Sequence, residues 1–395
     1  MGKDYRPESG HVGTEAKKKP AKKRKKRFIV LLAVEILAVL AIASGAFLYF
    51  YFIKGTHDQM TEKVDFKQDD IIINTEENVS KHFDTVSEKY TLIMLYGVDS
   101  RSDLDNTLTK ESNADSEILA CIDNETGEVK LVSIHRDTFV KTTTGKKNKL
   151  TNIYCSYGVQ ESLGTINMNL DLNIKQFVTV NWKAVVKAVN LLDGLDLDLT
   201  RSEVRAINKF GPHTGKVTGY TYHYLDPDDY SYSGDKKTAS VHLDGVQAAS
   251  YARVRNVAKE NDEGESEHDD IARASRQRIV IEAMLEKIKK NFSLGLLDDF
   301  KREVIPYIAT NIELSDLIGM VSNASRYSIG SQTMFPFKDM YKDSSNQSKA
   351  YIYCDTLTEN VTKLHEFLFG TVGYEPSSAV KELSDFITEY RYDHR

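Results

Sequence analysis

The sequence predicts an α/β or α+β sandwich, in which helices cover a sheet, preceded by one N-terminal transmembrane helix. Short apolar segments bounded by turn residues alternate with segments of helical period, an order typical of layered folds. A hydrophobic fraction of 41% with only seven prolines in 395 residues is sufficient for a packed core. One long apolar run, Phe28–Ile53, precedes all of these segments.

This apolar run is long enough to form a membrane anchor. Its 26 residues exceed the roughly 20 that span a bilayer as a helix. Residues 1–27 form a basic tail, and lysines and arginines are retained on the cytoplasmic side. We therefore expect a single-pass protein of the cell membrane, with a cytoplasmic N-terminus and an extracytoplasmic C-terminal domain. A cleaved signal peptide is the alternative, but its apolar core would be only about 7–15 residues long.

The charge distribution argues against nucleic acid as a partner. The first 27 residues carry a net charge of +8 and the whole chain −6, so the remainder carries −14. A surface that binds nucleic acid needs a positive potential instead. The three cysteines, Cys121, Cys155 and Cys354, lack metal-like spacing, and we expect buried free thiols.

The order of elements follows from local patterns. Residues 54–89 are polar and acidic, and we interpret them as a membrane-proximal linker with one helix. Four later segments are predicted as strands: Thr91–Val98, Ser116–Asp123, Glu128–His135 and Ile174–Asn181. The turn sequence NETG at 124–127 joins the second and third as a hairpin. Trp182–Gly194 has apolar residues at helical spacing and ends at glycine, which predicts a helix.

Two stretches are expected to be surface excursions. Gly211–Thr238 contains five tyrosines, and Glu260–Asp270 contains seven acids. Exposed tyrosines can stack on sugars, whereas a disordered insertion is the plainer interpretation of the first stretch.

Two aspartates lie where neighbouring strands would meet. Asp99 follows the first strand and Asp115 opens the second. If these strands are neighbours, the two carboxylates can share a divalent cation, and Mg²⁺ suits one or two carboxylates completed by water and phosphate oxygens. Most loop aspartates instead cap helices or shape turns.

Arg136 and Asp137 follow the third strand. They form either a local ion pair or, with Arg136 as a planar fork, part of a phosphate site. A lone histidine in a strand, such as His135, is most often a packed residue.

A second group of arginines flanks the acidic loop. Arg253 and Arg255 precede it and, if they lie on a strand, share one side. Arg273 and Gln277 share a helical face beyond it, where Asp269 or Asp270 is a candidate N-cap. Arginine in a first turn opposes the helix dipole, which indicates a strongly negative partner. The alternative, that these arginines only neutralise the loop, is equally compatible with the spacing.

Taken in order, six motifs resemble those of the LytR–CpsA–Psr family of extracytoplasmic phosphotransferases. They lie within roughly Tyr90–Lys290 and read YGVDSR, ADSEIL, LVSIHRD, KLTNIYCSYG, HLDGVQAASYARVR and DIARASRQ. The resemblance implies an α/β fold with a mixed central sheet sandwiched by helices, and an apolar groove for a polyprenyl chain. It also implies a catalytic domain at 90–375, followed by a C-terminal helix or tail at 376–395.

The resemblance also implies roles for individual residues of the site. Asp99 and Asp115 match the family's ligands for Mg²⁺ or Mn²⁺. Arg136 matches the arginine regarded as most important for catalysis. The positions that match substrate-binding residues are Arg101, Asn152, Arg253, Arg255, Arg273 and Gln277. The chain departs from the family at Asn113, where many members have arginine, at His135, where most have proline, and in a longer gap between Asp99 and Asp115.

The expected activity is transfer of a glycopolymer from an undecaprenyl-pyrophosphate carrier to peptidoglycan, with formation of a phosphodiester bond. Asp137, which we count among the catalytic residues, and Asp99 are the candidate bases for the acceptor hydroxyl. The polymer, teichoic acid or capsule, is left open. The alternatives are a polyprenyl-pyrophosphate phosphatase and a non-catalytic, membrane-anchored protein that binds envelope lipid or glycan. A DNA-binding regulator fits least, because it would need the acidic domain in the cytoplasm.

Overall fold

A computed structural model describes most of the chain beyond the predicted membrane segment. The described residues are 54–99, 108–234, 237–255, 257, 269–291, 293–313, 315–316, 320, 324–343 and 351–393. The basic tail, the predicted transmembrane helix Phe28–Ile53 and Arg101 lie outside these residues. Across the described ranges, no helix combines the length and the apolar character that a membrane crossing requires.

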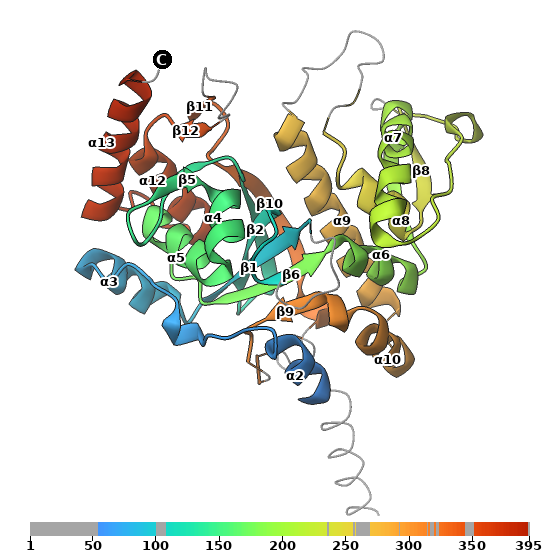
Figure 1. Cartoon of the computed structure of the whole chain (residues 1–395), viewed down its shortest axis with the longest axis horizontal. Coiled ribbons are helices and arrows are strands. Elements are labelled where there is room, and N and C mark those ends of the chain that lie inside the picture. The colour runs from blue at the N-terminus through green and yellow to red at the C-terminus, as the bar shows by residue number, and fades with distance from the viewer. Residues whose placement is uncertain are drawn as a thin grey trace, which may run out of the picture. The chain divides into compact units, whose positions relative to one another are not determined.

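A six-stranded mixed sheet forms the centre of the fold (Figure 1). Its strands, in spatial order, are β10 (Ser328–Phe335), β3 (Glu128–Ile134), β2 (Ala114–Asp123), β1 (Tyr90–Val98), β6 (Gln176–Asn181) and β9 (Ile308–Thr310). The β1–β6 and β3–β10 pairs are parallel, and the other pairs are antiparallel. The predicted hairpin is confirmed as β2–β3, and the four predicted strands correspond to β1, β2, β3 and β6.

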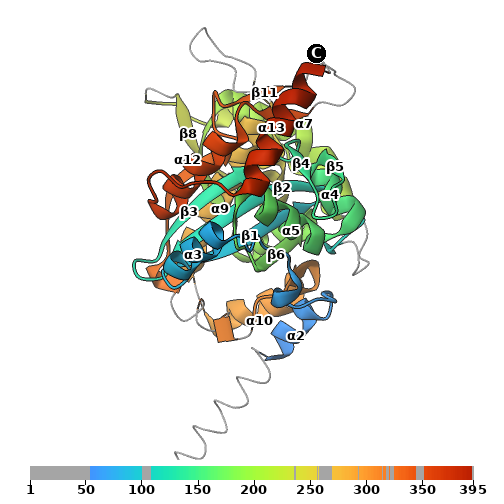
Figure 2. The same cartoon turned by 90° about the vertical axis from the view of Figure 1, so that its left-hand side faces the viewer.

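Five helices cover one face of this sheet, as Figure 2 shows from that side. They are α3 (Glu77–Val86), α4 (Leu150–Tyr157), α5 (Val159–Leu170), α12 (Leu357–Phe369) and α13 (Ser378–Asp393). Alternate strand residues such as Met94 and Leu119 are fully buried against them. Two short pairs flank this layer: β4 (Phe139–Lys141) with β5 (Lys147–Lys149), and β11 (Tyr341–Asp343) with β12 (Ile352–Cys354).

The opposite face carries the longest described helix, α9 (Asp269–Asn291). Ile118 and Leu131 from the sheet pack on this face, and Ile281 of α9 lies against them. The edge formed by β6 and β9 is packed against α2 (Gly55–Thr61) and α6 (Trp182–Leu191), beside α10 (Leu294–Glu303). The predicted helix after Ile174–Asn181 is confirmed as α6, whose N-cap Asn181 accepts a bond from Ala184 N.

A smaller layer packs on α6 and α9. It consists of β7 (Leu195–Thr200), α7 (Arg201–Thr218), β8 (Thr238–Leu243) and α8 (Gly245–Tyr251). The tyrosine-rich stretch is not a disordered insertion as a whole, because its first part completes α7. Tyr222 packs so closely on Gly211 that a Cβ there would lie 2.1 Å from its ring. Tyr224, in contrast, is 71% exposed.

Residues 54–89 contain two helices, α2 and α3, and contribute side chains to the core. Val79 and Phe83 of α3 are buried in the main cluster. The buried carboxylate of Asp171, just after α5, accepts bonds from Asn74 Nδ2 at 2.8 Å and Ser377 N at 2.7 Å. It thereby joins the N-terminal segment, α5 and the start of α13. The three cysteines are free thiols, as expected; Cys121 and Cys354 are buried, whereas Cys155 is only partly buried.

Replacement of this carboxylate tests the junction. In Asp171→Asn the new amide N–H₂ group faces buried donors. At least one of these donors then lacks an acceptor, so we expect the free energy of unfolding to fall by about 3 kcal/mol. Urea denaturation measures it. The matched control, Glu375→Gln at an exposed ion pair with Lys381, should change stability by less than about 0.5 kcal/mol. Equal stability of both variants would contradict a role for Asp171.

Candidate active site

Three of the predicted polar residues, Asp99, Asp115 and Arg136, lie at the same end of the central sheet. Strands β1 and β3 run in the same direction, so Asp99 after β1 and Arg136 after β3 lie at the same edge. β2 runs oppositely and begins there, with Asp115 as its second residue. Asp99 N donates to Asn113 O at 3.2 Å, which brings the two aspartates to adjacent chain ends.

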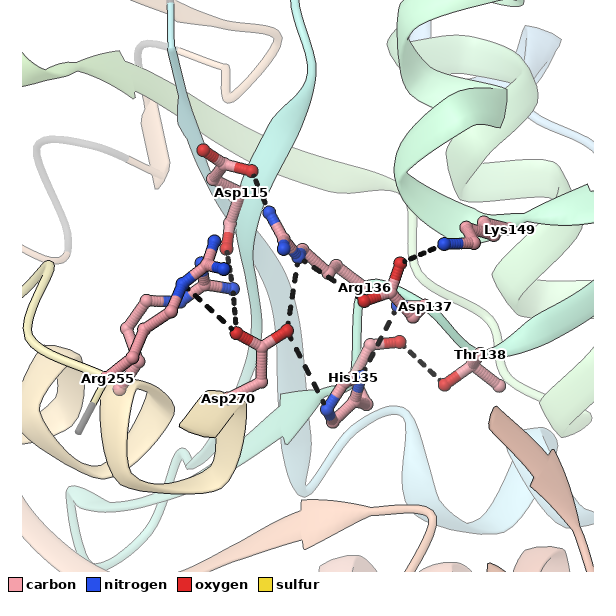
Figure 3. A network of polar contacts seen from close by, with 9 residues as sticks. Asp115, His135, Arg136, Asp137, Thr138, Lys149, Arg255 and Asp270 are labelled. Atoms are coloured by element: carbon pink, nitrogen blue, oxygen red, sulfur yellow. Dashed lines mark hydrogen bonds and ion pairs between the residues drawn. The ribbon is translucent and has the colours of Figure 1, made fainter. Parts of the chain in front are cut away.

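Three guanidinium groups converge on the half-buried carboxylate of Asp270, in the first turn of α9 (Figure 3). The nitrogens of Arg136 and Arg273 lie 3.2 Å from its oxygens, and Arg255 Nε lies 3.5 Å away. Burial alone would raise the pKa of Asp270, but the surrounding positive charges, that of Arg273 foremost, lower it. Of the arginines that flank the acidic loop, Arg255 and Arg273 therefore pair with a carboxylate of the protein itself.

Arg136 connects this carboxylate to the edge of the sheet. Its Nη1 donates to Asp115 Oδ1 at 2.5 Å, and its Nε lies 3.6 Å from Asp137. Its carbonyl oxygen accepts a bond from Thr151 N in the first turn of α4. Burial favours the neutral form, yet the carboxylates around it leave the pKa of Arg136 raised. This backbone and side-chain anchoring gives Arg136 a defined orientation.

Arg273 is the most buried of the three arginines, with 6% of its surface exposed. Burial, the proximity of Arg136 and that of Arg255 lower its pKa to about 10, although Asp270 opposes the shift. Its Nη2 donates to Asp115 O at 3.2 Å. Within the described part of the chain, Arg273 Nε and Gln277 Nε2 are buried donors without a hydrogen-bond acceptor. Buried donors of this kind are suited to a ligand with acceptor oxygens.

The structure corrects the expectation that Arg253 and Arg255 aim to one side from a strand. Helix α8 ends at Tyr251 and a turn follows, so the two side chains contact different groups. Arg253 donates to Thr214 Oγ1 at 2.9 Å and contacts His213, both on α7. Only Arg255 reaches Asp270.

The other two arginines of α9 have structural partners. Arg276 pairs with Glu203, and Arg278 donates to Ser133 and Gln332.

Carboxylate oxygens at the edge suit a hard divalent cation. Asp99 and Asp115 are oxygen donors on adjacent chain ends, so the chemistry of this pair fits Mg²⁺ or Mn²⁺. Asp115 Oδ1 is bound by Arg136. A second group, His135, Asp137 and Asp270, brings its donor atoms within 4.8 Å of one another. Its carboxylates already pair with Arg136 and, at Asp137, with Lys149, so cationic side chains occupy this second position.

An apolar cavity of about 480 Å³ lies beside the polar cluster. Its walls come from β1, β2, β6, α6, α9 and α10, with apolar side chains such as Leu95, Val180 and Met284. The smaller polar pocket next to it is lined by Asp115, Arg136, Asp270 and Arg273. Ser116 and Gln277 line both, which makes the two pockets adjacent. The arrangement fits an amphiphile with an apolar chain and an anionic head.

Two residues of the cluster were not among the predicted site residues. Lys149, the N-cap of α4, donates to Asp137 at 2.9 Å, a contact that the motif KLTNIYCSYG does not by itself predict. The sequence indicates Asp270 as a helix cap or as one acid that the flanking arginines neutralise, and its contacts with Arg255 and Arg273 confirm the second interpretation for this residue. Asn152 lies in the first turn of α4, beside these residues, and its amide donates to Asn148. Arg101 lies outside the described residues.

A third unforeseen residue is Glu117, whose side chain is 2% exposed and lines the polar pocket. Neither carboxyl oxygen has a hydrogen-bond partner among the described residues. Burial raises the pKa of this carboxyl group well above its ordinary range, which favours the neutral form.

Comparison with characterised proteins identifies the relatives of this chain. It is 25% identical over 309 residues to the polyisoprenyl-teichoic acid–peptidoglycan teichoic acid transferase TagT of Bacillus subtilis, covering 78% of this chain and 84% of TagT. It is 24% identical over 303 residues to TagU of Bacillus licheniformis, a transferase of the same description, covering 75% of this chain and 82% of TagU.

Solved structures show the same fold. The crystal structure of Bacillus subtilis TagT matches with a TM-score of 0.51 at 20% identity, covering 76% of this chain and 96% of TagT. That of protein gbs0355 from Streptococcus agalactiae matches with a TM-score of 0.52 at 21% identity, covering 77% and 93%. The expected mixed sheet between helices is thereby confirmed. The model of the LytR_cpsA_psr family matches residues 49–367, most of the sequence, and the chain belongs to this family.

Proposed function

We propose that this protein transfers a glycopolymer from an undecaprenyl-pyrophosphate carrier to peptidoglycan and forms a phosphodiester bond. The observation that carries the proposal is the convergence of Arg136, Arg255 and Arg273, from three separate segments, beside an apolar cavity. Such a site matches a lipid chain with a diphosphate head. The names of the relatives, polyisoprenyl-teichoic acid–peptidoglycan teichoic acid transferases, support the same substrates.

The reaction is phosphoryl transfer. An acceptor hydroxyl oxygen attacks the phosphorus that carries the glycopolymer, the bond to the bridging oxygen of the diphosphate breaks, and undecaprenyl phosphate leaves. Negative charge grows on the leaving phosphate, where Arg136 and Arg273 stabilise it through charge-assisted hydrogen bonds. Asp137 or Asp99 accepts the proton of the hydroxyl. Lys149 holds Asp137 in place by an ion pair of 2.9 Å.

A divalent cation completes the proposed site. Asp99 and Asp115 would hold Mg²⁺ or Mn²⁺, which supplies Lewis-acid stabilisation of the diphosphate when bound. Binding of a cation to Asp115 would weaken its 2.5 Å contact with Arg136 and leave that guanidinium for the substrate.

We place the protein in the cell membrane, anchored by Phe28–Ile53, with its N-terminus in the cytoplasm and its catalytic domain outside. The support is the basic tail before the apolar run. This orientation brings the site to the side of the membrane that carries peptidoglycan.

Loss of the central arginine tests the proposal directly. Arg136→Ala should lower the rate of transfer from a lipid-pyrophosphate donor by about 10²–10³-fold, because it removes an aimed cationic donor. Arg136→Lys keeps the charge without the fork and should recover only part of the rate. Thermal unfolding of each variant checks that the fold is retained.

Arg302→Ala is the matched control for this series. Arg302 is an exposed arginine of α10 that pairs with Asp299 and Glu303, so its loss should leave transfer unchanged. Wild-type transfer by Arg136→Ala would refute the assigned role.

Metal dependence gives a second test. A chelator should stop transfer, and Mg²⁺ or Mn²⁺ should restore it. Asp115→Asn should raise the Mg²⁺ concentration needed for half-maximal rate by at least about tenfold, because it removes a charged ligand. Asp196→Asn, at an exposed carboxylate of β7 that pairs with His242 and Lys287, serves as the control. An unchanged Mg²⁺ requirement in Asp115→Asn would exclude this pair as the metal site.

Product analysis separates transfer from its alternatives. With a glycan acceptor, the proposed reaction yields polymer linked to peptidoglycan together with undecaprenyl phosphate. Release of free phosphorylated polymer at the same rate without an acceptor would indicate a phosphatase, and binding without turnover would indicate a non-catalytic lipid-binding protein.

A further inference from the structure

The single tryptophan of the chain lines the apolar cavity and lies beside Arg253. Trp182 is the first residue of α6 and directly follows β6, whose end lies beside that of β1: Asn181 pairs with Val98, the residue before Asp99. Its ring contributes to the wall of the cavity. The guanidinium carbon of Arg253 lies 5.6 Å from the ring centroid. The indole is therefore in contact with both the lipid-like and the cationic surroundings.

The indole N–H of Trp182 is a buried donor. Across the described residues, Nε1 has no acceptor within hydrogen-bond distance. Native proteins pair such groups in the great majority of cases, because a buried donor without an acceptor is destabilising. Gln277 Nε2, on α9, is also a buried donor without an acceptor among the described residues, and Gln277 lines the same cavity. Two unsatisfied donors on residues that line one cavity indicate that acceptor atoms arrive with a ligand.

The nature of the acceptor follows from the neighbouring charge. A hydrocarbon chain offers no hydrogen-bond acceptor, so the apolar part of a lipid leaves both donors unsatisfied. The guanidinium of Arg253 lies over the indole ring, so an anionic head group attracted by this charge would lie beside Trp182. Phosphate oxygens are the strong acceptors that also attract arginine.

We propose that Trp182 is a specificity-determining residue that donates its Nε1–H to a phosphate oxygen of the prenyl diphosphate. The inference rests on the proposed function and adds to it a residue that distinguishes the phosphorylated lipid from a neutral one. Trp182 selects the ligand and takes no part in proton transfer.

Calorimetric titration of the full-length protein in mild detergent tests this role. The probes are geranylgeranyl pyrophosphate and geranylgeraniol, which share the chain and differ in the head group. Trp182→Phe keeps an aromatic ring and removes the N–H. We expect it to weaken binding of the pyrophosphate about tenfold, equivalent to about 1.4 kcal/mol, and binding of the alcohol less than about twofold. Because Trp182 is the only tryptophan, its fluorescence in the wild type should change when the pyrophosphate binds.

A cavity variant distinguishes head-group recognition from general packing. Met284→Ala removes an apolar side chain from the cavity wall on α9 and should weaken binding of both ligands by a similar factor. If Trp182→Phe weakens binding of both ligands equally, or leaves binding of the pyrophosphate unchanged, the proposed role of the indole is wrong. If the wild type binds neither ligand, the proposed function itself fails. Thermal unfolding confirms that each variant is folded.

Discussion

The site depends on one electrostatic constraint: guanidinium groups that lie close together repel one another unless an anion lies between them. Asp270 meets this requirement by contacting the mostly buried Arg136 and Arg273 and the more exposed Arg255 with one carboxylate. Arg136 extends from the end of β3, Arg273 from α9 and Arg255 from the segment after α8. The carboxylate therefore fixes the relative positions of three elements that are distant in sequence. It holds the arginines in a converging arrangement before any substrate arrives, which lowers the reorganisation that binding requires.

The position of α9 links this cluster to the apolar cavity. Its first turn carries Asp270 and Arg273, and one turn later Gln277 lines both pockets. Further along α9, Val280 and Met284 line the apolar cavity but not the polar pocket. A single helix thus changes from charged to polar to apolar along one face, as residues three and four apart share that face. An amphiphile bound here would lie along the same gradient, with its head at the start of α9 and its chain toward α10.

The strands, the β2–β3 hairpin and α6 could be predicted from the sequence because alternation, turn residues and helical period are local signals. Arg136 and Asp115 could be placed at a sheet edge for the same reason. The local pattern did not predict which arginines converge. The contact of Arg255 with Asp270 depends on a turn after α8, where the pattern indicated a strand. The packing of residues 54–89 could not be predicted either, because Asp171 joins this segment to the C-terminal helix through hydrogen bonds between residues that are far apart in the sequence.

In the proposed reaction, the balance of charge around the cluster would couple binding of the diphosphate to binding of a divalent cation. The cationic side chains are Arg136, Arg255, Arg273 and Lys149, and their partners are Asp115, Asp137 and Asp270. A diphosphate added to this nearly neutral group would face carboxylates as well as arginines, and repulsion would oppose it. If Asp115 holds a divalent cation as proposed, the charge of that carboxylate would be offset and Arg136 would be left for the substrate. Each ligand would then favour binding of the other, and by linkage the coupling would be reciprocal.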